Sequence, residues 1–268
     1  TGVLAALQLA FRSGNGGLPL TDGTPGWLLA TLVLGLGAVI QRFSLRYLLG
    51  SAEQPGTMAW LALLTSGTAV AWLATDTRLL LCGWGLALFS LTRLIGLARD
   101  WPAARAAARH AFAWLSLAWV ALAAVAAIAY TQSGTWDVGT AGAAQWPAWA
   151  RHVAAGALLL AAVIPAAQWP AQRWLMASMV APTPVSAIMH AGLVNAGGIL
   201  LVQFGGLLGL AESARAVLML AATASILIGG GMLLVQADVK RQLASSTVAQ
   251  MGCMLLQCAL GAYAAALI

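Results

Sequence analysis

The sequence has 268 residues, of which 61% are hydrophobic and only 7% are charged, whereas a globular domain carries roughly 25% charged residues. This small number of charges cannot form the water-facing surface of a soluble fold. The composition therefore excludes a soluble enzyme and indicates an integral membrane protein. The net charge of +6 comes from basic residues scattered along the chain, so we do not expect a nucleic-acid-binding protein.

Long apolar stretches follow one another along nearly the whole chain, and a membrane-spanning helix needs about 20 apolar residues. Hydropathy predicts a helical stump and then eight spans, at residues 3–11, 27–48, 57–75, 77–97, 110–130, 151–180, 184–209, 214–236 and 245–268. We therefore predict an all-α fold, a polytopic transmembrane helix bundle of about eight spans that forms a single transmembrane domain over residues 1–268. Both ends run into apolar residues, so we expect a fragment of a longer chain.

One predicted span, 151–180, is too long for a single straight crossing and contains Pro165 and Pro170. Proline removes a backbone donor and clashes with the preceding helical turn. We therefore predict two half-helices separated near these prolines, with Gln168 or Trp169 in the irregular segment. Such a break is tolerated in a membrane where the freed backbone groups face protein or water.

Loop charge predicts the orientation, because basic residues favour the cytoplasmic side. The side reached after span 27–48 collects Arg42, Arg46, Arg99, Arg105, Arg109, Arg173, Lys240 and Arg241. The opposite side holds Arg12, Arg78, Arg151 and Arg215. The first side is predicted to be cytoplasmic.

Polar residues inside apolar spans are costly, so each is a candidate for function. Ser186 and His190 are four residues apart and would share one helix face. Asn195 joins that face only if the helix contains a π-bulge. A histidine here can hold or pass a proton near neutral pH. The alternative is a neutral His190 that hydrogen-bonds to a neighbouring helix. No carboxylate or other metal ligand lies within a helical turn of His190, so we do not expect a metal site.

Lys240 is the only lysine of the chain, and it lies with Asp238 between two predicted spans. One interpretation is a cytoplasmic loop pair with Arg241. The other places Lys240 at a broken helix end that faces a water-filled cavity, where a buried lysine suits a proton relay.

Arg93 lies inside the cytoplasmic end of span 77–97. It is a candidate for an ion path, although a long basic side chain at this depth can also extend to the interface. The nearby run of Arg99, Arg105 and Arg109 is interpreted as a solvated or lipid-phosphate-binding face.

Three stretches resemble the signatures of the antiporter-like proton-pumping membrane subunits, the family of complex I and Mrp-type antiporters. They are "RFSLRYLLG" (42–50), "PTPVSAIMHAGLVNAGG" (182–198) and "ADVKRQLASSTVAQMG" (237–252). The resemblance implies an ion-translocating subunit with no covalent active site of its own. It assigns the ion path to His190 and Lys240, and Ser186, Asn195 and Arg93 are further candidates.

"HAGLVNAGG" and "TRLIGLARDWPAARAAARHAF" are most similar to the DabB branch, the membrane subunit of a bacterial inorganic-carbon accumulation complex. This resemblance implies a multi-pass protein of the bacterial cytoplasmic (inner) membrane, in a hetero-oligomer with a carbonic-anhydrase-like peripheral subunit of the DabA type. The chain contacts membrane lipid and is expected to hold no cofactor, and zinc is expected in the partner subunit.

Two positions depart from the wider family. Gly85 stands where a glutamate follows Gly-Trp, and Pro165 stands where a lysine precedes the "PTPVSA" stretch. These departures cast doubt on a full proton path of the complex I type. Two rival functions stay open. One is a pumping subunit of a respiratory NADH-quinone or hydrogenase-type complex, and the other is a structural anchor that conducts no ion.

Overall fold

The computed structural model of the chain describes residues 24–98, 100–138 and 143–266. Within these ranges every regular element is a helix, and the one extended contact is a single antiparallel bridge between Asp76 and Asp137. The predicted stump at 3–11, and Arg12 and Arg99 of the charge analysis, lie outside the described residues. The all-α prediction is confirmed.

Four long helices come first: α2 (Thr24–Tyr47), α3 (Gln54–Leu73), α4 (Thr77–Ile95) and α5 (Pro102–Ser133). Together with α11 (Glu212–Val235) they are the five helices in the described part of the chain that are long and apolar enough to cross a membrane. These correspond to the predicted spans 27–48, 57–75, 77–97, 110–130 and 214–236. The total of about eight spans stays a prediction.

Local signals in the sequence explain several helix ends. The Asp76 carboxylate accepts the Arg78 backbone N–H and caps α4, and Pro102 occupies the first turn of α5, where a missing N–H costs nothing. Gly134 ends α5 with a φ of 71°, a conformation that glycine adopts without strain. Helix α5 begins eight residues before the predicted span 110–130, because the run Pro102–Arg109 is rich in alanine, the strongest helix former.

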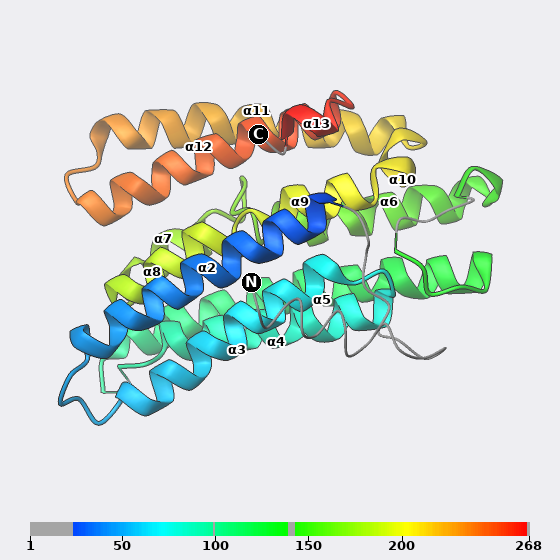
Figure 1. Cartoon of the computed structure of the whole chain (residues 1–268). Coiled ribbons are helices and arrows are strands. Elements are labelled where there is room, and N and C mark those ends of the chain that lie inside the picture. The colour runs from blue at the N-terminus through cyan, green and yellow to red at the C-terminus, as the bar shows by residue number, and fades with distance from the viewer. Residues whose placement is uncertain (1–23, 99, 139–142, 267–268) are drawn as a thin grey trace, which may run out of the picture.

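Neighbouring helices pack as α2–α3, α3–α4, α4–α5, α5–α6 and α11–α12, and Figure 1 shows α11 and α12 (Val239–Ala259) as a pair along one side of the bundle. Glycines allow the closest approaches. A Cβ at Gly229 of α11 would lie 2.8 Å from the backbone nitrogen of Ala249 in α12, so these two backbones meet without a side chain between them.

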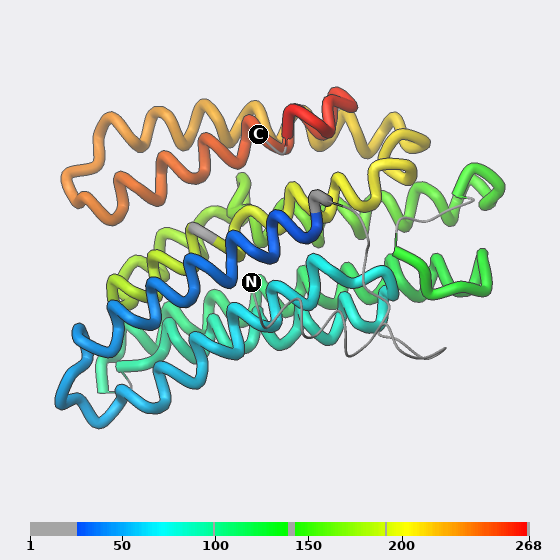
Figure 2. Tube along the Cα trace, in the orientation of Figure 1, coloured from blue at the N-terminus to red at the C-terminus, as the bar shows by residue number. Residues whose placement is uncertain are grey.

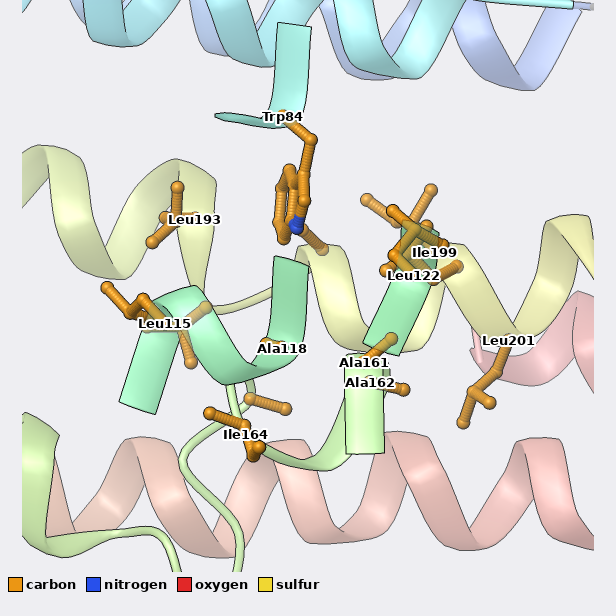
Figure 3. Close-up of a cluster of buried hydrophobic side chains, with 14 of the residues drawn as sticks. Trp84, Leu115, Ala118, Leu122, Ala161, Ala162, Ile164, Leu193, Ile199 and Leu201 are labelled. Atoms are coloured by element: carbon orange, nitrogen blue, oxygen red, sulfur yellow. The ribbon is translucent and has the colours of Figure 1, made fainter. Parts of the chain in front are cut away.

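The core lies between α4, α5, α6 (Ala148–Val163) and the segment from α8 (Thr183–Ile188) to α9 (Ala196–Gln203). Figure 3 shows the Trp84 side chain pointing into this space, with Leu115, Leu122, Ile164 and Ile199 around it. Helix α3 packs against α4, the helix that carries Trp84.

The predicted break in residues 151–180 is confirmed. Helix α6 ends at Val163, turns follow, and the chain resumes helical structure only in α7 (Arg173–Ala177) and the 3-10 turn η2 (Ser178–Val180). Figure 2 shows the trace leaving the helical path between α6 and α7. Two backbone groups of the irregular segment have hydrogen-bond partners in the protein. The Trp169 N–H donates to Ser225 Oγ at 2.8 Å, and the Ile164 carbonyl accepts the Trp174 indole N–H at 2.7 Å.

Two other predicted spans differ from the structure. Span 184–209 is not one helix but α8, a π-helical turn η3 (Met189–Leu193), α9 and the short α10 (Gly205–Gly209). Hydropathy averages over such interruptions, since the apolar residues continue through them. The helix of span 245–268 begins six residues early, at Val239, because Asp238 caps it, and it ends at Ala259, before the short α13 (Tyr263–Ala266).

Candidate functional site

The two polar stretches 181–198 and 237–252 meet in space although they are far apart in sequence. Helix α12 packs against α9, α7 and η2. Two hydrogen bonds join the stretches: Thr247 Oγ1 lies 3.1 Å from His190 Nδ1, and Lys240 Nζ donates to the Ala181 carbonyl at 3.0 Å. The segment that carries His190 is thereby fixed at two points to α12.

His190 lies in the π-helical turn η3 and is half-buried. Its partner Thr247 also lies 3.0 Å from the Leu243 carbonyl, the ordinary acceptor for a helical threonine hydroxyl. A hydroxyl has a single proton to donate. When Thr247 donates to Leu243, the contact with His190 requires the proton on Nδ1; when Thr247 turns to donate to Nδ1, the imidazole proton sits on Nε2. The geometry therefore accommodates both neutral tautomers of His190.

Lys240 lies in the first turn of α12, so the interpretation of this residue as part of a loop is wrong. The Asp238 carboxylate accepts the backbone N–H groups of Lys240 and Arg241 at 2.8 and 3.4 Å, which starts the helix at this point. Arg241 is exposed, whereas the half-buried Lys240 side chain runs to the Ala181 carbonyl. Ala181 precedes Pro182, so the ammonium group binds where the chain enters α8.

Ser186 and Asn195 lie on either side of the π-helical turn. Ser186 is buried, and its hydroxyl has no protein partner among the described residues. Asn195 is half-buried and stands at the start of α9, where its carbonyl accepts the Ile199 N–H at 3.2 Å. The π-helical turn that the sequence analysis named as the condition for aligning Asn195 with Ser186 and His190 is present.

Sequence reasoning missed Thr247 and the full role of Gln168. Gln168 was expected in the irregular segment, and it lies there fully buried, with its amide nitrogen 3.2 Å from the Val248 carbonyl of α12. The broken helix thus touches α12 one residue from the partner of His190. One sequence signal could have indicated Thr247. It lies seven residues after Lys240, a spacing that places both side chains on one face of a helix.

Arg93 lies apart from this cluster. Its guanidinium carbon stands 5.6 Å from the centre of the Trp60 ring, and the side chain lines a groove formed by residues of α3, α4 and the chain through α5. None of the residues that line this groove belongs to the two polar stretches. The structure does not bring Arg93 together with His190 or Lys240.

The two departures from the family pattern have structural counterparts. A Cβ at Gly85 would lie 2.8 Å from Trp119 Nε1, and that indole nitrogen donates to the Leu81 carbonyl at 2.9 Å. The indole occupies the space that a glutamate side chain would need. Pro165 is buried in the turn that follows α6, at the point where the helix ends.

Several known proteins are similar to this chain. The family model described as "NADH:quinone oxidoreductase/Mrp antiporter, TM" matches residues 74–268. The chain is 45% identical over 254 residues to the "Probable inorganic carbon transporter subunit DabB" of Bacillus anthracis, covering 91% of this chain and 49% of that protein. It is 35% identical over 236 residues to "NADH-quinone oxidoreductase subunit L" of Mycobacterium tuberculosis, covering 86% and 37%.

Among solved structures, the Mrp complex from Dietzia sp. DQ12-45-1b contains a similar chain, with a TM-score of 0.85, 27% identity and coverage of 90% of this chain and 27% of that one. Respiratory complex I from Thermus thermophilus shares the fold, with a TM-score of 0.75 at 23% identity and coverage of 95% and 56%. The chain spans about half the length of the DabB protein that it matches.

Proposed function

The chain belongs to the NADH:quinone oxidoreductase/Mrp antiporter transmembrane family, and from this premise we propose that it is a cation-translocating membrane subunit that energises inorganic-carbon uptake. The cation is a proton or a sodium ion. The 45% identity to a protein named as an inorganic carbon transporter subunit supports the carbon-uptake part of this proposal. The subunit itself forms and breaks no covalent bond of the substrate.

The observation that carries the proposal is the pair of hydrogen bonds between the two polar stretches. His190 and Lys240 are the titratable side chains of these stretches that reach across to the facing segment. Thr247 can turn between the Leu243 carbonyl and His190, so either neutral tautomer of His190 keeps a hydrogen bond at Nδ1. A change of tautomer takes up a proton at one ring nitrogen and releases a proton from the other, which is the step that a relay needs. Lys240 holds a positive charge at the entry to α8, which biases where a second cation can stand.

Buried polar atoms extend this cluster along the same segments. Ser186 Oγ in α8, Gln203 Oε1 in α9 and Gln168 Oε1 in the broken helix are buried without a protein partner among the described residues. A buried polar group in a membrane needs a partner, because no lipid atom can hydrogen-bond to it. We assign these atoms, with Asn195, to the lining of the ion path.

The proposal includes a partner. A carbonic-anhydrase-like peripheral subunit would hold zinc and convert CO2 to bicarbonate, while this chain, in the bacterial inner membrane, supplies the coupling to cation flow. No cofactor is assigned to this chain. The two subunits would form a hetero-oligomer.

A second candidate is a pumping subunit of a respiratory complex, which the 35% identity to a NADH-quinone oxidoreductase subunit favours. The position of Gly85 argues against it, because the Trp119 indole fills the place of the glutamate expected in that group. A third candidate is a structural anchor that conducts no ion.

The test is complementation. The gene for the protein, with its chromosomal neighbours, is expressed in a bacterium that lacks carbonic anhydrase and needs added CO2. We expect growth in ambient air, and we expect a protonophore or a sodium ionophore to stop bicarbonate uptake. His190→Ala should abolish growth and uptake at an unchanged protein level, whereas Arg46→Ala, an exposed residue at the end of α2, should not.

Each rival has its own outcome. Uptake that persists with both ionophores, or growth with His190→Ala, would favour the structural anchor. Failure to complement, together with quinone reduction by NADH or hydrogen that depends on the protein, would favour the respiratory complex.

A further inference from the structure

A groove with three arginines lies outside the cluster described above. It has a volume of about 880 Å³ and is formed where α4 ends and α5 begins, against Trp60 of α3. Arg93, Arg105 and Arg109 line it together with Phe89 and Phe112. We refer to these residues with Trp60 as the basic groove. Its volume is within the range of about 300–1,000 Å³ that small-molecule sites occupy.

The charge of the basic groove is unbalanced. Among the described residues no acidic side chain lines it, and the one salt bridge in this part of the chain joins Asp76 and Arg78 elsewhere. Arg105 and Arg109 are four residues apart on one helix face, a spacing at which like charges destabilise a helix. The Trp60 ring holds the Arg93 guanidinium beside them, at 5.6 Å from the ring centre. Three guanidinium groups that line one groove favour a phosphate, which a guanidinium group can bind with paired hydrogen bonds.

An apolar groove continues from the basic groove along α4 and α5. It has a volume of about 430 Å³ and shares Phe89, Thr92 and Phe112 with the basic groove. Its other lining residues include Leu88, Leu115 and Val120. The exposed fractions of Phe89 and Phe112 are 47% and 51%, so the groove is open on its outer side. A ligand that fills both grooves has an anionic head and an apolar tail.

The length of the combined groove matches one half of a bilayer. Arg109 and Val120 both lie on α5, and at 1.5 Å per residue they are about 16 Å apart along the helix axis. Half of the hydrocarbon core of a bilayer is about 15 Å thick. A phosphate beside Arg109 would therefore stand at the membrane surface while its acyl chain reaches the bilayer centre beside Val120.

We propose that the basic groove and its apolar continuation bind an anionic phospholipid, with the phosphate among Arg93, Arg105 and Arg109 and an acyl chain between α4 and α5. The two arginines of α5 can be removed without touching the packed core, since both are exposed. The α2 pair Arg42 and Arg46 has the same four-residue spacing and is also exposed, which makes it a matched control.

The intact protein, purified with any subunits that accompany it, is exchanged into detergent with phosphatidylglycerol or with phosphatidylcholine, and bound lipid is measured by native mass spectrometry. We expect preferential retention of phosphatidylglycerol. An arginine near an anionic lipid contributes about fivefold in affinity, so Arg105→Gln with Arg109→Gln should weaken retention roughly 25-fold. Arg42→Gln with Arg46→Gln should leave it within about twofold.

Further arms distinguish the sources of the ligand. Inorganic phosphate or glycerol 3-phosphate should not displace the lipid, and displacement by either at millimolar concentration would indicate a free-anion site instead. Ser116→Phe fills the apolar groove and should lower the retention of phosphatidylglycerol with all three arginines intact. Equal retention of the two lipids, or an equal loss in both arginine pairs, would overturn the proposal. So would a subunit that crosslinks to position 109 and excludes lipid.

Discussion

Replacing Thr247 by valine removes one hydroxyl from the contact between η3 and α12 and keeps the shape of the side chain. The hydroxyl stands 3.1 Å from His190 Nδ1 and 3.0 Å from the Leu243 carbonyl. Leu243 is the i−4 residue of the same helix, so its carbonyl keeps the Thr247 backbone N–H as a donor. His190 Nδ1 has no such second partner among the described residues. The substitution therefore acts mainly on the imidazole.

The magnitude follows from leaving one half-buried nitrogen unpaired. An unsatisfied buried donor or acceptor costs about 1–3 kcal/mol, and each 1.4 kcal/mol corresponds to about tenfold in an equilibrium or a rate. We expect Thr247→Val to slow cation-coupled uptake about 10- to 100-fold and to displace its pH profile, because the two tautomers of His190 are no longer matched. Thr247→Ser keeps the hydroxyl and should restore most of the rate and the original profile.

The assay is bicarbonate uptake, and cation flux into proteoliposomes, measured between pH 6 and 9 at equal protein level. Thr68→Val is the matched control, because Thr68 is buried in α3 and its hydroxyl donates to the i−4 carbonyl of Leu64 at 2.7 Å. If Thr247→Val and Thr68→Val give the same rate and the same pH profile, Thr247 serves only packing, and the assignment of His190 to the ion path loses its main support.

Three further predictions follow from single contacts. Lys240→Met should stop cation-coupled uptake at a normal protein level, whereas Arg241→Met, one residue further on and exposed, should retain it; equal loss in both would point to a general charge effect. Gly229→Leu should lower the free energy of unfolding by about 1–3 kcal/mol, because the new Cβ would lie 2.8 Å from the backbone of α12. The same change at Gly230 should be tolerated, because a Cβ there would have nothing within 4 Å. The side-chain hydrogen bond from Arg78 lowers the pKa of Asp76. The Asp76 carboxylate therefore stabilises the fold fully above the unfolded-state pKa of about 3.9, and this stabilisation is lost as the pH falls through the lowered folded-state pKa. Asp76→Asn should therefore lower the melting temperature at pH 7, and the difference from the parent should vanish in strong acid.

Much of the fold could be predicted because membrane helices are encoded locally. A stretch of about 20 apolar residues requires no knowledge of its neighbours, and five such predictions coincide with helices. The break after Val163 is also local, since Pro165 cannot continue a helix. The start of α12 was missed because hydropathy treats Lys240 and Arg241 as loop residues, although Asp238 is a good helix cap.

The site could be predicted only in part, because its contacts join segments far apart in sequence. His190 and Thr247 are 57 residues apart, and Lys240 and Ala181 are 59 apart. A polar residue in an apolar span indicates that a partner exists, but which partner depends on how α12 rotates against η2 and η3. The backbones of α11 and α12 approach closely at Gly229, but no local sequence pattern specifies which face of α12 meets η2 and η3.

The packing explains both departures from the family pattern, at Gly85 and at Pro165. Trp119 fills the space beside Gly85, and its indole N–H is already bonded to Leu81, so a carboxylate cannot enter there without displacing the indole. Pro165 turns the chain at the end of α6, which brings the amide of Gln168 to α12. The two charged residues that the family resemblance predicts, one in α4 and one just after α6, are thus replaced by an aromatic contact and a turn. A cation path in this chain would then depend on what remains, the contact of α12 with η2 and η3 through Lys240, Thr247 and His190.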